Sequence, residues 1–217
     1  AAPCPWELAV EWREKTATRI VRGYGMTELF RPLSFRADDP SDMPSAVGRP
    51  VPGVDIRLAV DEATSRDGIG ELWIKSPAMM DGYLDAPDET NEVIADGWFK
   101  TGDLATVSSE GYVQIVGRMR ERILRGGYSI FPQEVEAVLL SHPAVAEAAV
   151  VGVANADLGE EIAAFVSLKP TARLSSEDLL GYCKEHLARY KYPRQVHILA
   201  ELPKGPTGKP QRIGLAA

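Results

Sequence analysis

The pattern of apolar residues changes at Gly117, and this change limits the possible folds more than any other feature of the chain. Between residues 45 and 116 the sequence has short runs rich in branched and aromatic residues, such as "VDIRLAV" and "GELWIKS", separated by Gly, Pro and Asp. Such runs predict short strands. After Gly117 the pattern is strand, helix, strand, strand, helix, strand. We therefore expect an α+β fold: a small β-rich subdomain, either a sheet or a distorted barrel, followed by a compact α/β domain.

The same pattern sets the expected domain boundaries. The charged stretch "GRMRER", residues 117–122, lies between two apolar strands and marks the main boundary. We expect residues 31–117 to form the β-rich subdomain and residues 118–217 to form a mobile C-terminal α/β domain. Residues 1–30 predict one helix and the strand "TRIVRGY", which cannot close a core of their own. We interpret them as the remnant of a larger N-terminal region of the same polypeptide.

Local signals place three helices. Pro87 and the acidic residues after it favour the start of a short helix, and Pro132 favours the start of a second. Ser175 or Ser176 is expected to cap a third, with Leu179 on its apolar face.

Composition excludes some partners. The chain has 24 basic and 31 acidic residues, a net charge of −7, with no block of like charge, so we expect no nucleic-acid partner. The longest apolar run contains Glu147 and is shorter than the roughly 20 residues needed to cross a bilayer, so no membrane insertion is expected. Cys4 and Cys183 have no metal or disulfide spacing, which fits a cytoplasmic location.

Four stretches combine glycine with polar residues suited to nucleotides: "GYGMTE" (23–28), "KTGD" (100–103), "GRMRERILRGGYSI" (117–130) and "PKGPTGK" (203–209). In this order and at these intervals they resemble the adenylate-forming superfamily, most closely its AMP-forming acyl-CoA synthetases. The resemblance covers essentially the whole chain. It implies that a carboxylic acid is activated with ATP to an acyl-adenylate and passed to the thiol of coenzyme A, with ATP/AMP, Mg²⁺ and coenzyme A as cofactors.

The first stretch is expected to bind the nucleotide. Gly25 allows close approach of the backbone to a ligand, and Tyr24 offers an aromatic face to adenine. Thr27 can hydrogen-bond a phosphate oxygen and is expected to act in catalysis. Glu28 is expected to act there too, as a ligand of a Mg²⁺ ion shared with phosphate. The alternative is that Glu28 only begins the loop "LFRPLS".

Two further residues are expected to contact the nucleotide. Asp103, predicted in a turn after a strand, can accept both ribose hydroxyls in charge-assisted hydrogen bonds. The alternative is ordinary turn chemistry. Arg118 is expected to contact ribose or phosphate, and a surface ion pair is its alternative.

Lys209 is the expected catalytic cation. Attack of a carboxylate on the α-phosphate brings two anions together, and a preorganised cation lowers that barrier. Pro206, Gly208 and Pro210 limit where the backbone of Lys209 can go.

The resemblance also implies a second pose of the C-terminal domain. The swivel would lie in residues 117–122, with Glu121 where the family usually carries an aspartate or lysine. Gly126, Gly127 and Tyr128 would then enter the site and border a narrow passage for the pantetheine arm of coenzyme A. The nucleotide end of coenzyme A would meet a basic surface made of Arg189, Lys191 and Arg194. The alternative is that these residues only complement a helix dipole.

The sequence departs from the family in one major respect. The Gly/Ser/Thr-rich phosphate loop and most of the acyl pocket do not occur in these residues, so the fragment alone is expected to be inactive. Two alternatives stay open: an adenylation domain that loads a carrier protein, and a non-catalytic nucleotide-binding or regulatory module. The acid itself is not identified by the sequence, because only Gly25 and Met26 are expected near the acyl group.

Overall fold

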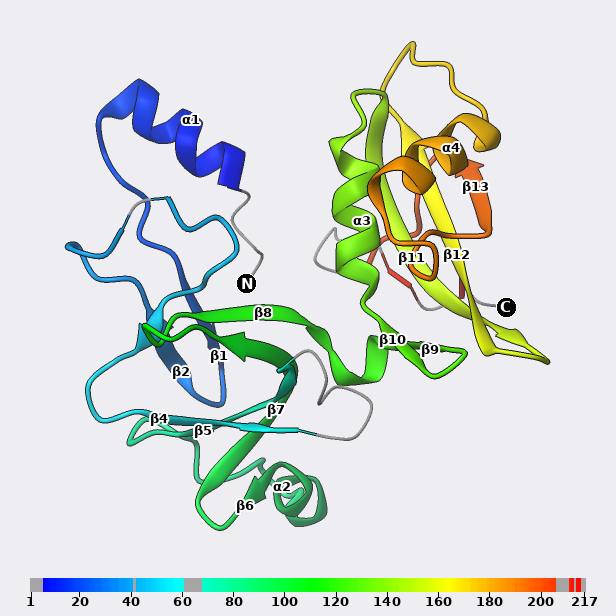
Figure 1. The fold of residues 1–217 in the computed structure, drawn as a ribbon. Coiled ribbons are helices and arrows are strands. Elements are labelled where there is room, and N and C mark those ends of the chain that lie inside the picture. The colour runs from blue at the N-terminus through cyan, green and yellow to red at the C-terminus, as the bar shows by residue number, and fades with distance from the viewer. Residues whose placement is uncertain (1–5, 41, 61–67, 206–210, 213, 216–217) are drawn as a thin grey trace. The chain divides into compact units, whose positions relative to one another are not determined.

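The chain divides into two compact units, residues 1–116 (unit 1) and 117–217 (unit 2), and each is described by itself. The structure, a computed structural model, describes residues 6–40, 42–60, 68–205, 211–212 and 214–215 (Figure 1). It has the expected α+β class, with helices and separate sheets in both units. Among the described residues, no helix combines the length and the apolar character needed to cross a bilayer.

The described part of unit 1 contains two helices and two sheets. The first sheet is antiparallel, in the order β1-β2-β3. The second has the order β4-β5-β7-β6, and β8 also pairs with β7. The elements of this part of the chain are α1 (Trp6–Thr16), β1 (Gly23–Met26), β2 (Phe30–Ser34), β3 (Arg49–Pro50), β4 (Asp55–Ala59), β5 (Gly70–Lys75), α2 (Pro87–Val93), β6 (Ile94–Ala95), β7 (Trp98–Val107) and β8 (Val113–Arg118).

The two sheets of unit 1 share one core. Leu33 of β2, Ile74 of β5 and Phe99 of β7 are buried in the same apolar cluster, with Val113 of β8. The described strands form open sheets, so the β-rich part is not the distorted barrel that the sequence left as an option. Among the described residues β4 pairs only with β5 and β6 only with β7, whereas closing a barrel requires continuous pairing from the first strand to the last.

Unit 2 is a sheet covered by two helices. Its strand order is β10-β9-β12-β11, and β13 runs parallel to β12. Helices α3 and α4 pack against one cluster that includes strand residues of β11 and β12, so they cover the same face (Figure 1). The elements are η2 (Met119–Glu121), β9 (Ile123–Arg125), β10 (Tyr128–Ile130), α3 (Pro132–Ser141), β11 (Val145–Asn155), β12 (Gly159–Leu168), α4 (Ser176–His186) and β13 (Gln195–Leu199).

The local helix signals were accurate. Helices α2 and α3 begin at Pro87 and Pro132, each with proline in the first turn. Helix α4 follows Ser175, whose side chain and that of Asp178 form a capping box. Two strand predictions were wrong in detail. The strand expected over "TRIVRGY" begins only at Gly23, and the strand expected before α3 is the hairpin β9–β10.

Candidate functional site

Asp103 lies inside strand β7, at a bulge, and not in the turn that the sequence predicted. Glu71 pairs with Leu104 and Trp73 with Lys100, so three residues of β7 face a single residue of β5. Gly102 in this bulge has φ +68°, a left-handed conformation that glycine adopts readily. The bulge interrupts the alternation of side chains between the two faces of the sheet, and Asp103 is 95 % buried within it, at 5 % exposure.

Neighbouring side chains fix this bulge. The Thr101 hydroxyl accepts from the amide of Asp103 at 3.1 Å and donates to the carbonyl of Leu72 at 2.7 Å. One carboxylate oxygen of Glu71 accepts from the amide of Gly102 at 3.0 Å. The other accepts from the indole of Trp73 at 2.7 Å. The carboxylate of Asp103 therefore sits on a backbone held from both sides.

The structure brings Tyr24 and Asp103 together, although 79 positions separate them. The Tyr24 hydroxyl donates to Oδ2 of Asp103 at 2.6 Å. The hairpin that carries Tyr24 is tightly closed: a Cβ on Gly25 would lie 2.1 Å from the carbonyl oxygen of Phe30. This close approach of β1 to β2 is a structural reason for glycine at position 25, beside the ligand role predicted for it.

Glu28 lies in the turn between β1 and β2 and has a partner that the sequence analysis did not identify. The Tyr83 hydroxyl donates to Oε1 of Glu28 at 3.0 Å, and the amide of Met80 donates to its backbone carbonyl at 2.8 Å. Partial burial and then this carboxylate raise the pKa of Tyr83. Thr27 in the same turn is exposed. The family resemblance, which covers essentially the whole chain, also includes the stretch "GELWIKSPAMMDGYL" (70–84) with Tyr83, so the sequence held a signal for this residue.

A Mg²⁺ ion fits Glu28 only as a shared ion. Among the residues that the structure describes, no group of three or more His, Cys, Asp or Glu side chains could hold a metal by itself. Mg²⁺ is commonly bound by one or two carboxylates together with water and substrate phosphates. The half-buried carboxylate of Glu28, oriented by Tyr83, is compatible with such a role.

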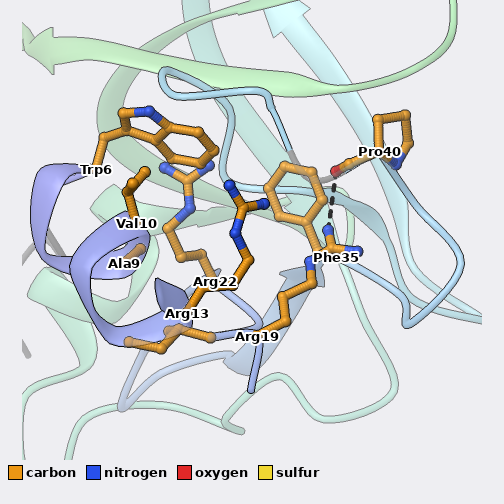
Figure 2. Close-up of a pocket in the computed structure, with 9 residues that line it drawn as sticks. Trp6, Ala9, Val10, Arg13, Arg19, Arg22, Phe35 and Pro40 are labelled. Atoms are coloured by element: carbon orange, nitrogen blue, oxygen red, sulfur yellow. Dashed lines mark hydrogen bonds between the residues drawn. The ribbon is translucent and has the colours of Figure 1, made fainter. Parts of the chain in front are cut away.

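The small cavity beside α1 is not a nucleotide site. Its volume is about 20 Å³, and residues of α1, Arg19, Arg22, Phe35 and Pro40 line it (Figure 2). The guanidinium of Arg22 lies near the rings of Trp6 and Phe35, and Arg22 donates to the carbonyls of Met43 and Pro44. A space of this size holds about one water molecule.

The glycines of unit 2 form a tight turn. Gly126 and Gly127 join β9 to β10 with φ values of +55° and +82°, as a two-residue hairpin turn requires. Tyr128 follows this turn, is 53 % exposed and stacks on Tyr190 with 4.5 Å between ring centroids. Arg118 is exposed at the end of β8.

Two of the basic residues predicted near the end of α4, Lys191 and Arg194, have partners. Lys191 forms an ion pair with Glu134 at 2.8 Å. Arg194 stacks on the ring of Tyr192 at 3.9 Å and donates to the carbonyl of Arg189 at 3.4 Å.

Lys209 lies outside the described residues, with Pro206, Gly208 and Pro210, but both flanks of this segment are described. The amide of Gln211 donates to the carbonyl of Pro203 at 2.7 Å. Lys204 pairs with Glu147 at 3.1 Å, and Arg212 pairs with Glu121 and Glu136. The sequence analysis missed Arg212, Glu136 and Glu147, because nothing in the local pattern indicates partners so far away along the chain.

Comparisons with known proteins agree along the whole chain. The family model for AMP-binding enzymes matches residues 1–84, and the model for the AMP-binding enzyme C-terminal domain matches residues 134–209. A long-chain-fatty-acid–CoA ligase from Yersinia pestis is 38 % identical over 209 residues, which is 95 % of this chain. A sulfoacetate–CoA ligase from Cupriavidus necator is 40 % identical over 200 residues, which is 90 % of this chain.

A solved structure gives the same result. The o-succinylbenzoate CoA synthetase from Bacillus subtilis, in complex with an acyl-adenylate intermediate, matches with a TM-score of 0.88 and 33 % identity. The match covers 100 % of this chain and 45 % of that one. The chain spans 37 % of the Yersinia relative and 39 % of the Cupriavidus relative. With both family models and these relatives in agreement, the chain belongs to the family of AMP-binding enzymes.

Proposed function

We propose that the complete protein is an AMP-forming acid–thiol ligase. It activates a carboxylic acid with ATP to an acyl-adenylate and transfers the acyl group to coenzyme A. The observation that carries this proposal is the hydrogen bond between Tyr24 and Asp103, because it joins the residue proposed for adenine to the residue proposed for ribose. The matches to named CoA ligases, which cover 90 % or more of the chain, support the same conclusion.

Asp103 would bind the ribose. A carboxylate accepts hydroxyl donors in charge-assisted hydrogen bonds, which are stronger than neutral ones. The bulge around Gly102 holds this carboxylate in place before any ligand arrives, so little ordering is needed on binding. The ring of Tyr24, oriented by its bond to Asp103, would lie against adenine.

Glu28 would hold Mg²⁺ against the phosphates, and the bound ion would neutralise part of their charge. Tyr83 would orient the carboxylate, since outer hydrogen bonds to a ligating group fix its direction. Thr27, exposed in the same turn, would donate to a phosphate oxygen.

Unit 2 would supply the mobile groups. Lys209 would approach the α-phosphate during adenylation, and residues 117–122 would act as the swivel. Arg118 would contact ribose or phosphate. After the swivel turns, Gly126, Gly127 and Tyr128 would border the pantetheine arm. In this arrangement the large domain would end with residues 1–30. The β-rich subdomain would comprise residues 31–117, and the mobile domain would comprise residues 118–217. We place this activity in the cytoplasm.

The acid is proposed only as a carboxylic acid. The two relatives above are named for a long-chain fatty acid and for sulfoacetate, and their identities to this chain are 38 % and 40 %. Similarity over this part of the protein therefore does not favour one acid over the other.

Substitution of Asp103 tests the proposal in the complete protein. Asp103→Asn should lower kcat/KM for ATP in acid-dependent pyrophosphate exchange by about 10- to 100-fold, because a hydrogen bond to a charged group contributes roughly 1.5–3 kcal/mol. Tyr24→Phe removes only a hydroxyl and should have a smaller effect. Asp55→Asn, at an exposed position of β4, serves as the matched control.

Two outcomes would contradict the proposal. One is equal ATP kinetics for Asp103→Asn and Asp55→Asn. The other is a wild-type protein that forms no acyl-CoA from any acid of a broad panel. Transfer to a phosphopantetheinylated carrier protein in place of free coenzyme A would instead assign the protein to the carrier-loading class.

A further inference from the structure

Arg212 binds two carboxylates at the point where the chain leaves the segment that carries Lys209. Its Nη1 lies 2.7 Å from Oε2 of Glu121, and its Nη2 lies 2.8 and 2.9 Å from the two carboxylate oxygens of Glu136. The Arg212 side chain is 27 % exposed. Glu121 belongs to η2 and Glu136 to the middle of α3, so one guanidinium joins three separate parts of unit 2.

The two carboxylates are themselves held in place. Oε1 of Glu136 also accepts from the amide of Val150 in β11 at 2.8 Å. Oε2 of Glu121 accepts from the side-chain amide of Gln133 at 3.1 Å. Gln133 in turn lies against Gly117, where an added Cβ would stand 2.9 Å from its Oε1. The network thus runs from the start of residues 117–122 through α3 to the C-terminal segment.

The other flank of the Lys209 segment is also anchored. Leu202 is buried, with 2 % exposure, and Lys204 pairs with Glu147. The hydrogen bond from Gln211 to Pro203 joins the two flanks. Lys209 precedes Arg212 by three residues, so the Arg212 network is the anchor on the C-terminal side of the lysine.

The network fixes position more than it adds stability. Burial raises the pKa of Glu136, and the opposing charge of Arg212 does not overcome this effect. Removing two charges partly from water costs free energy that offsets their attraction, so a partly buried ion pair of this kind often contributes little net stability compared with an apolar replacement. It does specify one geometry, since a guanidinium offers a rigid fork of donors that two carboxylates can satisfy together.

We propose that Arg212 is a positioning residue that couples the C-terminal flank of the Lys209 segment to residues 117–122. By this coupling the two segments would keep one relative placement while unit 2 moves. The inference rests on the proposed function, because Arg212 would act through Lys209 in the adenylation half-reaction.

The test compares the two half-reactions in the complete ligase. Arg212→Met should lower kcat for adenylation by about 10- to 100-fold, because a displacement of about 1 Å of one group at the reacting centre can cause a loss of this size. The KM values for ATP and acid should stay within about threefold, since the segment does not bind them. Thioester formation from supplied acyl-adenylate should stay within about twofold. Arg212→Lys, which keeps the charge but not the fork, should fall between wild type and Arg212→Met.

Ser175→Ala is the matched control. It removes the cap of α4 in the same unit and leaves the Arg212 network intact. If general weakening of unit 2 were responsible, this variant would show the same split between half-reactions. We expect it to change both by less than about twofold.

Amide hydrogen exchange gives a readout that does not depend on activity. In Arg212→Met, exchange in a peptide covering residues 203–212 should accelerate by at least about fivefold, because the amide of Gln211, next to the lost anchor, is no longer held against the carbonyl of Pro203. In Ser175→Ala this peptide should exchange as in wild type.

Unchanged exchange, unchanged adenylation, or equal loss in both half-reactions would each overturn the inference. If Lys209→Ala lowers the rate of adenylation and Arg212→Met does not, the inference alone is overturned. If the wild-type protein has no ligase activity, the proposed function is overturned.

Discussion

The two units hold their key groups in different ways. In unit 1, the Asp103 carboxylate is buried on a strand bulge that Thr101 and Glu71 fix through the backbone. In unit 2, the two flanks of the segment carrying Lys209 are anchored through partly exposed ion pairs of Lys204 and Arg212. A group that receives a ligand benefits from a rigid site, whereas a group that must arrive and depart needs anchors at its flanks only. The proposed division of work between binding and delivery follows from this difference.

Lys209→Ala should have the largest effect and tests the delivery half of the comparison. It should lower adenylation in the complete ligase by about 100- to 1,000-fold, the loss typical of one preorganised group that stabilises the transition state. Thioester formation from supplied acyl-adenylate should persist. The two rates are measured by pyrophosphate exchange and by release of coenzyme A thioester. Equal loss in both would mean that the lysine serves the whole cycle.

Glu121→Pro should have a smaller effect and tests whether movement is needed. Proline restricts φ, and η2 lies within the proposed swivel, so one half-reaction should slow by about 10-fold or more relative to the other. Single-turnover measurements of each step provide the check. Because Glu121 also binds Arg212, a thermal melt should accompany them. Uniform slowing with a lower melting temperature would indicate misfolding.

The smallest expected effect concerns stability against pH, to which one carboxyl group in each unit, Asp39 and Glu136, should contribute in opposite directions. Burial alone would raise the pKa of Asp39 in unit 1. The hydrogen bonds from the Arg36 amide and the Tyr112 hydroxyl, with the charge of Arg49, outweigh burial and lower it. A lowered pKa means that this stabilisation is complete above the unfolded value of about 4 and is lost as pH falls through the lower folded value.

The pKa of Glu136 in unit 2 is shifted in the opposite direction. Its pKa is raised in the folded state, so its contribution to the stability of unit 2 should grow as pH falls from the folded pKa toward the unfolded value of about 4.3. Asp39→Asn and Glu136→Gln should each remove the contribution of that one carboxyl group to the pH dependence of its unit. Hydrogen exchange resolved by peptide, corrected for the intrinsic rate at each pH, can follow the units separately. The same pH response in a unit before and after its substitution would contradict the assignment.

The sequence was informative where the signal is local. Proline at helix starts and the Ser175 cap act within one turn, so α2, α3 and α4 were placed accurately. The bulge at Asp103 was not predicted, because it depends on pairing between β5 and β7. The partners of the candidate site were also missed, because Glu28 and Tyr83 are 55 positions apart and Glu121 and Arg212 are 91 apart. Family-like motifs supplied Asp103 and Lys209 without their surroundings.

The left-handed backbone at Gly102 has a consequence for chemical synthesis. Nothing lies within 4 Å of a Cβ built at this position, and its φ is +68°. An L-alanine would therefore meet a conformational penalty and no collision, whereas a mirror-image D-alanine prefers this region of φ. A semisynthetic protein with D-alanine at position 102 should keep the strand register and stiffen the denatured chain, so the handedness of one residue is all that the bulge requires.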